Sequence, residues 1–473
     1  MPNKYLYINT IGCQMNVYDS AQIAMGLAAL GYQQTAILEL ADLVIVNTCT
    51  IRAKAEQKAF SFLGRLARLK AKKPDLISAV GGCVAQQEGR KIFKRIPHLD
   101  LVFGTQAIDR LPDLIQKIET QRCRIVDIEP AETPRAANAG ARVPAADQVS
   151  QFVTIMRGCD NFCSYCVVPY VRGRETSRHQ DAIIEEIQEF AQAGVKEVTL
   201  LGQNVNSYGK KEGLCSFSQL LSRVARIEPL LRIRFTTSHP KDLDDELINA
   251  FRTNPKLCDH IHLPVQSGSD RVLQRMNRRY TKALYLDKVA KLRDTCPDIA
   301  ITSDFIVGFP GESQADFDET LDLIRTVEFD GLFAFKYSDR PNAPAAQFED
   351  KVPQQQSKQR LQVLLDLQET ITRKKNKTLV GTCWTILTEG FSKKQTAGSL
   401  NQATPAVQWT GRTTTNKIVN FYDDHDSAAL NNMAPGQLVD VNIEKAYSHS
   451  LLGKPIESRI AAARLKGEGS YAA

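Results

Sequence analysis

Long apolar segments are missing from this chain of 473 residues. No hydrophobic run reaches the roughly 18 residues that a membrane-spanning helix requires. The first ten residues, MPNKYLYINT, carry one lysine before a strand-like pattern, which is not the pattern of a secretory signal peptide. Both absences favour a cytoplasmic protein, where thiols stay reduced. The 11 cysteines are therefore expected to be metal ligands, catalytic groups or core residues rather than disulfides.

A strong overall charge is also missing. The chain has 60 Lys and Arg residues against 53 Asp and Glu residues, which gives a net charge of +7. The window 371–420 alone holds eight Lys or Arg residues and one acid, Glu389. The rest of the chain is therefore close to neutral, and any binding of a large polyanion is expected to involve this window.

A fourth cysteine is missing where a closed metal site would need one. In RGCDNFCSYC, residues 157–166, the pattern C-x3-C-x2-C contains Cys159, Cys163 and Cys166, which we call the loop cysteines. Structural zinc sites use four ligands, and the nearest downstream histidine, His179, is 13 residues away without a partner motif. Three thiolates can instead bind three irons of a [4Fe–4S] cluster. The pattern therefore predicts a cluster whose fourth iron is open to a small molecule.

Three further cysteines each end a predicted strand. Cys13, Cys49 and Cys83 close the segments YLYINTIGC, LVIVNTC and LISAVGGC and lie 36 and 34 residues apart. We call them the strand-end cysteines. The carboxyl ends of parallel strands share one edge of a sheet, so these thiols can converge. One buried cysteine is usually a core residue, but three such placements predict a second iron–sulfur site. The remaining five are expected to be plain thiols: Cys123, Cys215, Cys258, Cys296 and Cys383.

The apolar patterns predict an α/β protein with three domains. Residues 1–128 alternate strands and helices, which predicts an open parallel sheet of flavodoxin-like type. Its helices are expected at 20–30, 54–69, 87–95 and 108–119. Residues 129–150 hold seven Ala and three Pro and predict a linker. The last three segments are a partial (β/α)6 barrel at 151–375, a small antiparallel β-barrel at 376–454 and a tail at 455–473.

The motifs and their order resemble the radical S-adenosylmethionine enzymes. An aromatic residue, Tyr165, precedes the last loop cysteine, and four motifs follow at predicted strand ends: LLGQNV, SHP, PVQSGS and DFIVGFPGE. The segments IGCQMNVYDS, VIVNTCTIRAKAE, VGGCVAQ and MRGCDNFCSYCVVPYVRGRE narrow the resemblance to the methylthiotransferases. That family has an N-terminal domain with three cluster cysteines and a C-terminal TRAM domain. CQMN, CSYCVVPYVRGRE and WTGRTTTNKIVNF are similar to the branch that acts on adenosine-37 of tRNA.

The resemblance implies a reaction and its cofactors. Two [4Fe–4S] clusters and S-adenosylmethionine would place a methylthio group on C2 of N6-isopentenyladenosine-37. The loop cysteines would hold the cluster that cleaves S-adenosylmethionine, and the strand-end cysteines would hold the cluster that supplies sulfur. Five side chains would lie at the cofactor: Tyr165, Arg174 and Gln203 at or near its methionine end, and Ser238 and Gln266 near its sulfonium or ribose.

Basic residues suggest where RNA binds. The basic window lies in the predicted barrel, with Lys393, Lys394, Arg412, Lys417 and both tryptophans, Trp384 and Trp409. A second run, Arg275, Arg278 and Arg279 in QRMNRRY, follows the fourth barrel strand and is expected to grip phosphates. The alternative is a solvated basic surface, with the tryptophans in a core.

The resemblance also implies partners. The expected partners are a tRNA anticodon loop with its unpaired bases, an electron donor such as flavodoxin, and a sulfur source. The protein is expected to be a monomer and to have no membrane partner. Two alternatives stay open at this point. One is the same chemistry on a ribosomal protein or on threonylcarbamoyl-adenosine-37, whose branches read CPKN and CKVN where this chain reads CQMN. The other is a non-catalytic iron–sulfur protein that binds RNA.

Overall fold

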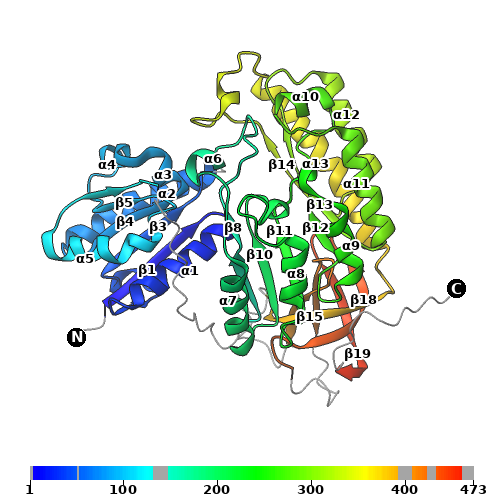
Figure 1. Cartoon of the computed structure of the whole chain (residues 1–473), viewed down its shortest axis with the longest axis horizontal. Helices are drawn as coiled ribbons and strands as arrows, with labels where there is room; N and C mark the ends of the chain where they lie inside the picture. The colour runs from blue at the N-terminus through cyan, green and yellow to red at the C-terminus, as the bar shows by residue number, and fades with distance from the viewer. Residues whose placement is uncertain (1–3, 51–52, 131–147, 393–406, 423–432, 461–473) are drawn as a thin grey trace.

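The computed structural model describes residues 4–50, 53–130, 148–392, 407–422 and 433–460. The N-terminal domain contains one parallel sheet, at the left of Figure 1. Its strands are β1 (Lys4–Ile11), β2 (Tyr32–Gln34), β3 (Leu43–Thr48), β4 (Ile77–Gly82), β5 (Leu101–Phe103) and β6 (Ile125–Asp127). Their order is β2-β1-β3-β4-β5-β6, and all neighbouring pairs are parallel. This order is the flavodoxin-like one with an extra edge strand, so the predicted fold is confirmed.

Helices cover both faces of this sheet. Apolar residues of α1 (Gln14–Ala28) and α5 (Leu111–Gln121) pack on one face, and those of α2 (Ala53–Lys72), α3 (Cys83–Glu88) and α4 (Ile92–Arg95) pack on the other. Because both faces are covered, β3 and β4 are buried along their whole length. This double burial explains their continuous apolar sequences, LVIVNT and ISAVGG.

Two of these helices begin earlier than the sequence pattern predicted. Helix α1 begins at Gln14, not near residue 20, and α3 begins at Cys83, not near residue 87. Cys13 is the N-cap of α1, and its backbone N–H donates to Asn16 Oδ1 at 3.2 Å. Both first turns directly continue a strand-end segment, IGC before α1 and VGG before α3, so the sequence pattern does not mark where the strand segment ends and the helix begins. The correction places Cys13 and Cys83 at helix N-termini.

The central domain is a partial barrel of two three-stranded parallel sheets. One sheet has the order β11-β10-β7 and the other β12-β13-β14. The strands are β7 (Ser150–Thr154), β10 (Glu197–Leu201), β11 (Arg232–Thr236), β12 (His260–His262), β13 (Ala300–Val307) and β14 (Gly331–Lys336). A single bridge between Ile233 and Leu257 joins β11 to the segment before β12. The predicted six-stranded barrel is confirmed, although its pairing is interrupted in the middle.

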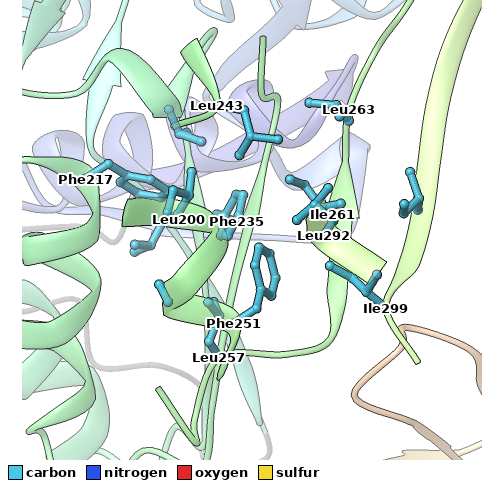
Figure 2. Packing of buried hydrophobic residues seen from close by; sticks show 14 of the residues in the cluster. Leu200, Phe217, Phe235, Leu243, Phe251, Leu257, Ile261, Leu263, Leu292 and Ile299 are labelled. Atoms are coloured by element: carbon cyan, nitrogen blue, oxygen red, sulfur yellow. The ribbon is translucent and has the colours of Figure 1, made fainter. Parts of the chain in front are cut away.

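Helices on the outside of the partial barrel enclose its main apolar core. Figure 2 shows part of this core, where Leu200, Phe235 and Ile261 of the strands face Phe251 and Leu292 of the helices. The helices are α7 (Gln180–Gln192), α8 (Phe217–Ala225), α9 (Asp245–Thr253), α11 (Lys282–Thr295), α12 (Gln314–Val327) and α13 (Gln354–Lys377), with the shorter α6 (Val168–Val171) and α10 (Asp270–Arg275). No helix in the described ranges is long and apolar enough to cross a membrane.

The C-terminal domain is a closed five-stranded barrel with the order β15-β16-β17-β19-β18. Its strands are β15 (Cys383–Phe391), β16 (Gln408–Arg412), β17 (Ile418–Tyr422), β18 (Leu438–Ala446) and β19 (Leu451–Ile460). The predicted antiparallel barrel needs two corrections. Strands β17 and β19 are parallel, because the connection through β18 returns the chain in the same direction, and β19 continues to Ile460 instead of ending at residue 454.

Candidate active site

The loop cysteines lie between a short hairpin and helix α6. Strand β7 ends at Thr154, and the chain then forms β8 (Met156–Arg157), which pairs antiparallel with β9 (Thr176–Ser177). Cys159 therefore follows a strand that has already left the barrel sheet. Gly158 has a φ of 76°, and a Cβ there would lie 2.1 Å from the Arg174 carbonyl oxygen, so only glycine fits this turn.

The segment after α10 holds this loop in place. Ser164 donates from its backbone N–H to the Met276 carbonyl at 3.0 Å and from its hydroxyl to the Arg275 carbonyl at 2.8 Å. The Asn277 amide donates to the Phe162 carbonyl at 2.9 Å. The loop cysteines are thus fixed by residues more than 100 positions further along the chain.

Burial keeps two of the loop cysteines protonated as free thiols. It raises the pKa of Cys159 to about 11 and that of Cys166 to about 12. Iron binds thiolates, so a metal must displace these protons when it enters. Thiolates are soft ligands, so three of them in one loop are suited to iron–sulfur clusters rather than to hard cations.

The strand-end cysteines also meet at one edge of their sheet. Cys13 caps α1, Cys49 directly follows β3, and Cys83 opens α3. A hydrogen bond with the Cys49 thiol, helped by the charge of Arg172, lowers the pKa of Cys13 to about 6 despite its burial. Cys83 is different, because burial raises the pKa of its thiol more than Arg172 lowers it. A thiolate at a helix N-terminus is a strong metal ligand.

The two groups of cysteines adjoin each other. Cys83 packs against Val167, the residue after Cys166, and against Val171. Helices α3 and α6 are in contact, and Figure 1 shows α6 between the N-terminal and central domains. The Thr105 hydroxyl donates to the Val171 carbonyl at 2.7 Å. The loop that carries one group therefore packs directly on the sheet edge that carries the other.

Arg172 extends from the loop segment to the strand-end cysteines and acts on them electrostatically. It lies six residues after Cys166 and reaches into the N-terminal domain, where Nη2 donates to Asp19 Oδ2 at 2.9 Å. Both side chains are buried, with 6% and 2% of their surface exposed. The positive charge of Arg172 lowers the pKa of Cys13, and it opposes the increase in the pKa of Cys83 that burial causes. Nothing in the sequence pattern distinguished Arg172 from its neighbours, and only the domain packing reveals it.

The donor sets fit clusters rather than single ions. In the described parts of the chain, no three Cys, His, Asp or Glu side chains converge where one metal ion would bind. In a [4Fe–4S] cluster, each thiolate binds a different iron, so the sulfur atoms do not need to converge on one point. Each group offers three thiols, which fits a four-iron cluster with one iron left for another ligand.

Unpartnered polar atoms lie just beyond the carboxyl ends of β10 and β11. Gln203 Oε1 and Ser238 Oγ are buried without a hydrogen-bond partner in the structure, as are both amide atoms of Asn206 and Nε2 of His239. A buried polar atom left unsatisfied costs about 1–3 kcal/mol. These atoms therefore form a site for a polar ligand. The sequence prediction included Gln203 and Ser238 but missed Asn206 and His239, although His239 stands inside the SHP motif.

The other three residues predicted to contact the cofactor, Gln266, Tyr165 and Arg174, differ in how deeply they are buried. Gln266 is buried and has a φ of 79°, and its backbone pairs with β13. The Tyr165 hydroxyl lies 3.4 Å from Arg278 Nη1, in the interior. Arg174 is at the surface, with 66% of its side chain exposed, and it pairs with Asp160 at 3.3 Å. The structure thus places Arg174 on the outside of the loop rather than among the unpartnered polar atoms.

The predicted RNA contacts also divide into exposed and buried residues. Arg279 is exposed, and Arg275 is half-buried and pairs with Asp350 at 2.7 Å. Arg278 is only 4% exposed, so its prediction as a surface phosphate contact is wrong. The side chain points inward because four acceptors there bind its guanidinium.

In the C-terminal barrel, Arg412 pairs with Glu389 at 2.8 Å and remains one-third exposed. Lys417 is only 16% exposed and pairs with Asp330 at the start of β14, so its prediction as a free RNA contact is also wrong. It lies at a domain interface because Asp330 and Asn376 bind its ammonium there. Trp409 belongs to the barrel core. Lys393 and Lys394 lie outside the described residues.

Comparisons with known proteins agree with this arrangement. Residues 153–324 match the radical SAM superfamily, residues 5–104 the uncharacterized protein family UPF0004, and residues 401–456 the TRAM domain. The radical S-adenosylmethionine methyltransferase TsrM from Kitasatospora setae, solved with tryptophan and a SAM analog, has a similar fold. It superposes with a TM-score of 0.56 at 15% identity, over 73% of this chain and 75% of that one.

Relatives of much higher identity cover nearly the whole chain. The tRNA-2-methylthio-N(6)-dimethylallyladenosine synthase of Desulfosudis oleivorans is 54% identical over 95% of this chain and 96% of its own. The enzyme of the same name from Syntrophus aciditrophicus is 51% identical over 96% of this chain and 95% of its own. The chain therefore belongs to the radical SAM superfamily and, within it, to the family of the tRNA-2-methylthio-N(6)-dimethylallyladenosine synthases.

Proposed function

We propose that this protein transfers a methylthio group to C2 of N6-isopentenyladenosine at position 37 of tRNA. One observation carries the proposal: two groups of three thiols adjoin each other at the carboxyl edges of two parallel sheets. Each group offers three free thiols. The named relatives, about half identical to this chain, favour tRNA over the ribosomal protein and the threonylcarbamoyl-adenosine alternatives.

Each part of the site has a role in this proposal. When bound, two [4Fe–4S] clusters and S-adenosylmethionine supply the radical and the sulfur. The loop cysteines hold one cluster and the strand-end cysteines hold the other. Gln203, Ser238 and His239 bind polar groups of S-adenosylmethionine, because their unsatisfied atoms lie just beyond the carboxyl ends of β10 and β11. The contact of α6 with α3 keeps the two groups of thiols next to each other.

The basic residues give the RNA two places to bind. Arg279 is exposed on the segment that holds the loop cysteines, so it would contact phosphates near the target base. The C-terminal barrel lies against the opposite end of the central strands, where Arg234 at the start of β11 donates to Thr413 and Thr414. The barrel would therefore bind a part of the tRNA that is further from the modified base. The affinity of the protein for RNA is expected to fall as the salt concentration rises, because contacts to phosphates are weakened by salt.

We further infer a cytoplasmic monomer that receives electrons from a small carrier such as flavodoxin. Its sulfur must be replaced from a separate source, because a protein-bound sulfide is consumed when the product leaves. The relatives' names place tRNA as the substrate of those proteins, which is consistent with a cytoplasmic location.

Separate cysteine variants test whether the loop cysteines hold the cluster that cleaves S-adenosylmethionine and the strand-end cysteines hold the cluster that supplies sulfur. The assay is anaerobic, with dithionite, S-adenosylmethionine and tRNA, and it measures 5′-deoxyadenosine and 2-methylthio nucleosides by mass spectrometry. We expect Cys159→Ala to abolish both products. We expect Cys13→Ala to keep 5′-deoxyadenosine and to lose the methylthio nucleoside. The exposed Cys383, replaced by Ser, is the matched control and should retain both.

Three results would contradict the proposed function. Methylthio product from Cys13→Ala would show that the strand-end cysteines do not hold the sulfur-donating cluster. A wild-type protein that binds tRNA and forms no 5′-deoxyadenosine would support the non-catalytic alternative. Unchanged 2-methylthio nucleosides in a strain that lacks the gene would remove tRNA as the substrate.

A further inference from the structure

Arg278 is a buried guanidinium that contacts a loop cysteine. It lies in the segment after α10, and only 4% of its surface is exposed. Its Nη1 donates to the Cys163 sulfur and to the Tyr165 hydroxyl, at 3.4 Å each. Nη2 donates to the Pro264 carbonyl at 2.6 Å, and Nε donates to the Tyr280 hydroxyl at 3.1 Å. All three nitrogens of the group are therefore occupied.

The charge of Arg278 has no carboxylate partner within the described residues. Three of the four other guanidiniums that are similarly buried pair with a carboxylate: Arg172 with Asp19, Arg234 with Glu197 and Arg360 with Glu312. The fourth, Arg232, donates to the backbone carbonyls of Arg412 and Thr385 and donates no hydrogen bond to a thiol in the described residues. A buried charge without a counter-charge is costly. The acceptors around Arg278 are two neutral phenols, one peptide carbonyl and the sulfur of Cys163. Of these, Cys163 is the group that becomes negative when it binds iron.

We propose that Arg278 donates a hydrogen bond to the iron-bound thiolate of Cys163 and serves as the internal counter-charge of that cluster, which raises its reduction potential. This inference rests on the proposed function, because it requires a cluster on the loop cysteines. A reduced cluster carries one more negative charge than an oxidised one, so a fixed positive charge stabilises the reduced form. Hydrogen bonds to cluster sulfur atoms act in the same direction.

The geometry makes Arg278 specific to one of the two clusters. The strand-end cysteines have their own buried guanidinium, Arg172, which is paired with Asp19 and so carries no net charge as a pair. Arg278 acts on the cluster through Cys163 and does not contact the reacting atoms, so it is a positioning residue. Nη1 of Arg278 also donates to the Tyr165 hydroxyl. The same guanidinium therefore orients the loop and supplies the positive charge beside Cys163.

The test is a redox titration of the reconstituted full-length protein, followed by electron paramagnetic resonance. The background lacks the strand-end cysteines, with Cys13, Cys49 and Cys83 replaced by Ala, so that only the cluster on the loop cysteines gives a signal. In this background we compare Arg278→Met, which removes the charge and the donors, with Arg278→Lys, which keeps the charge. Arg279→Met, at the exposed neighbouring position, is the matched control.

We expect Arg278→Met to shift the potential to a more negative value, with Arg278→Lys intermediate and Arg279→Met unchanged. A second titration, in a background that lacks the loop cysteines, should show no shift of the other cluster in any of these variants. An unchanged potential in Arg278→Met with full iron content would overturn the proposal. An equal shift of both clusters would also overturn it, because that result indicates a general loosening of the fold.

A variant of Arg278 that binds no iron has no measurable potential, and its iron content is then the result that is compared. If Arg278→Met binds no iron, Arg278→Lys decides: normal loading with a potential close to that of the parent supports the counter-charge. Loss of iron in the lysine variant as well would show that the shape of the guanidinium is what matters, and it would overturn the proposal. The titration needs no tRNA, so a failed methylthio assay does not affect it. If even the parent protein binds no iron, it is the proposed function that fails.

Discussion

At the scale of single residues, the two buried guanidiniums near the cysteines differ in their partners. Arg172 pairs with the buried carboxylate of Asp19, whereas Arg278 contacts a thiol, two phenols and a carbonyl. The first is expected to hold two domains together through a neutral pair. The second leaves its charge available to the cluster on the loop cysteines. The same side chain therefore has different effects according to what surrounds it.

The Arg172 pair has a measurable consequence for stability. We expect Arg172→Met to destabilise the protein by about 3–5 kcal/mol, because Asp19 is then left as an unpaired buried charge. The double variant that also replaces Asp19 with Asn should recover much of this loss. Thermal unfolding of the purified protein measures both. Arg174→Met, at an exposed position nearby, is the control and should change little, and an equal loss in the two single variants would contradict the interpretation.

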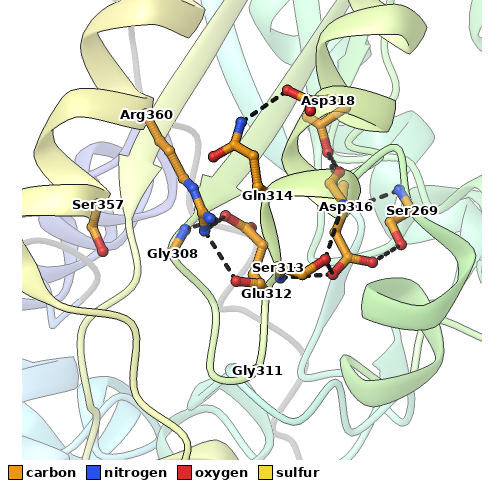
Figure 3. Close-up of polar contacts among 12 residues, drawn as sticks. Ser269, Gly308, Gly311, Glu312, Ser313, Gln314, Asp316, Asp318, Ser357 and Arg360 are labelled. Atoms are coloured by element: carbon orange, nitrogen blue, oxygen red, sulfur yellow. Dashed lines mark hydrogen bonds and ion pairs between the residues drawn. The ribbon is translucent and has the colours of Figure 1, made fainter.

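At the scale of elements, the turn after β13 shows how a short motif is fixed by distant segments. Figure 3 shows Glu312 of the DFIVGFPGE motif between the Gly308 backbone N–H and Arg360 of α13, which donate to it at 2.9 and 2.7 Å. Gly308 has a φ of 68°, and a Cβ there would lie 2.1 Å from the Ser357 hydroxyl. The motif therefore needs glycine for its own backbone and for its contact with α13.

The start of α12 is stabilised by Asp316 in a pH-dependent way. Its carboxylate accepts from Ser313 in a capping box, from Ser269 at 2.6 Å and from Arg271. Burial alone would raise the pKa of Asp316, but hydrogen bonds from Arg271, Ser269 and Ser313 lower it well below its usual value. Because the pKa is lower in the folded protein, this stabilisation is complete above the unfolded pKa of roughly 3.9 and is lost as the pH falls below it.

The Asp316→Asn variant tests this effect. We expect it to lose about 1–3 kcal/mol at pH 7, since a buried charge-assisted network is broken. The difference from the wild type should shrink as the pH falls below about 4, because the unfolded wild-type chain then binds a proton at Asp316 while the folded protein, with its lower pKa, does not. Urea unfolding at several pH values measures the difference. Asp318→Asn, two residues away and exposed, is the control, and a difference that stays constant with pH would contradict the linkage.

At the scale of the whole molecule, the C-terminal barrel is attached to the amino ends of the central strands. Arg234 donates to the Thr413 and Thr414 carbonyls at 2.7 and 3.0 Å while it pairs with Glu197 at 2.8 Å. Arg232 donates to the Thr385 carbonyl at 3.0 Å. Lys417 pairs with Asp330 from the barrel side. In Figure 1 the barrel accordingly lies at the bottom, away from α6.

Loss of this attachment should affect RNA binding and not the radical chemistry. We expect Arg234→Met to leave Glu197 unpaired, to loosen the barrel and to speed tryptic cleavage near Lys377, between α13 and β15. Affinity for tRNA should fall, while 5′-deoxyadenosine formation without tRNA should be unchanged. Arg252→Met, on the surface of α9, is the control. Unaltered proteolysis and affinity in Arg234→Met would show that the barrel is held by other contacts.

The sequence alone predicted the types of the folded units, which the structure confirms, and the two groups of cysteines that are proposed to hold the clusters. Thiol spacing identifies the loop cysteines because a short loop must bring them together in any fold. The strand-end cysteines are identified because parallel strands share an edge. The short edge strands β2 and β6 are harder to recognise, because neither is buried along its whole length and neither forms a continuous apolar run.

Only the tertiary structure decided which charged side chains are free. Arg278 and Arg279 are adjacent in the sequence, yet one is buried against Cys163 and the other is exposed. Lys417 and Arg412 share one basic window, yet Lys417 is held at a domain interface. Burial depends on contacts between distant segments, and composition carries no information about them. For the same reason, the adjacency of the two groups of thiols followed only from the packing of α6 on α3.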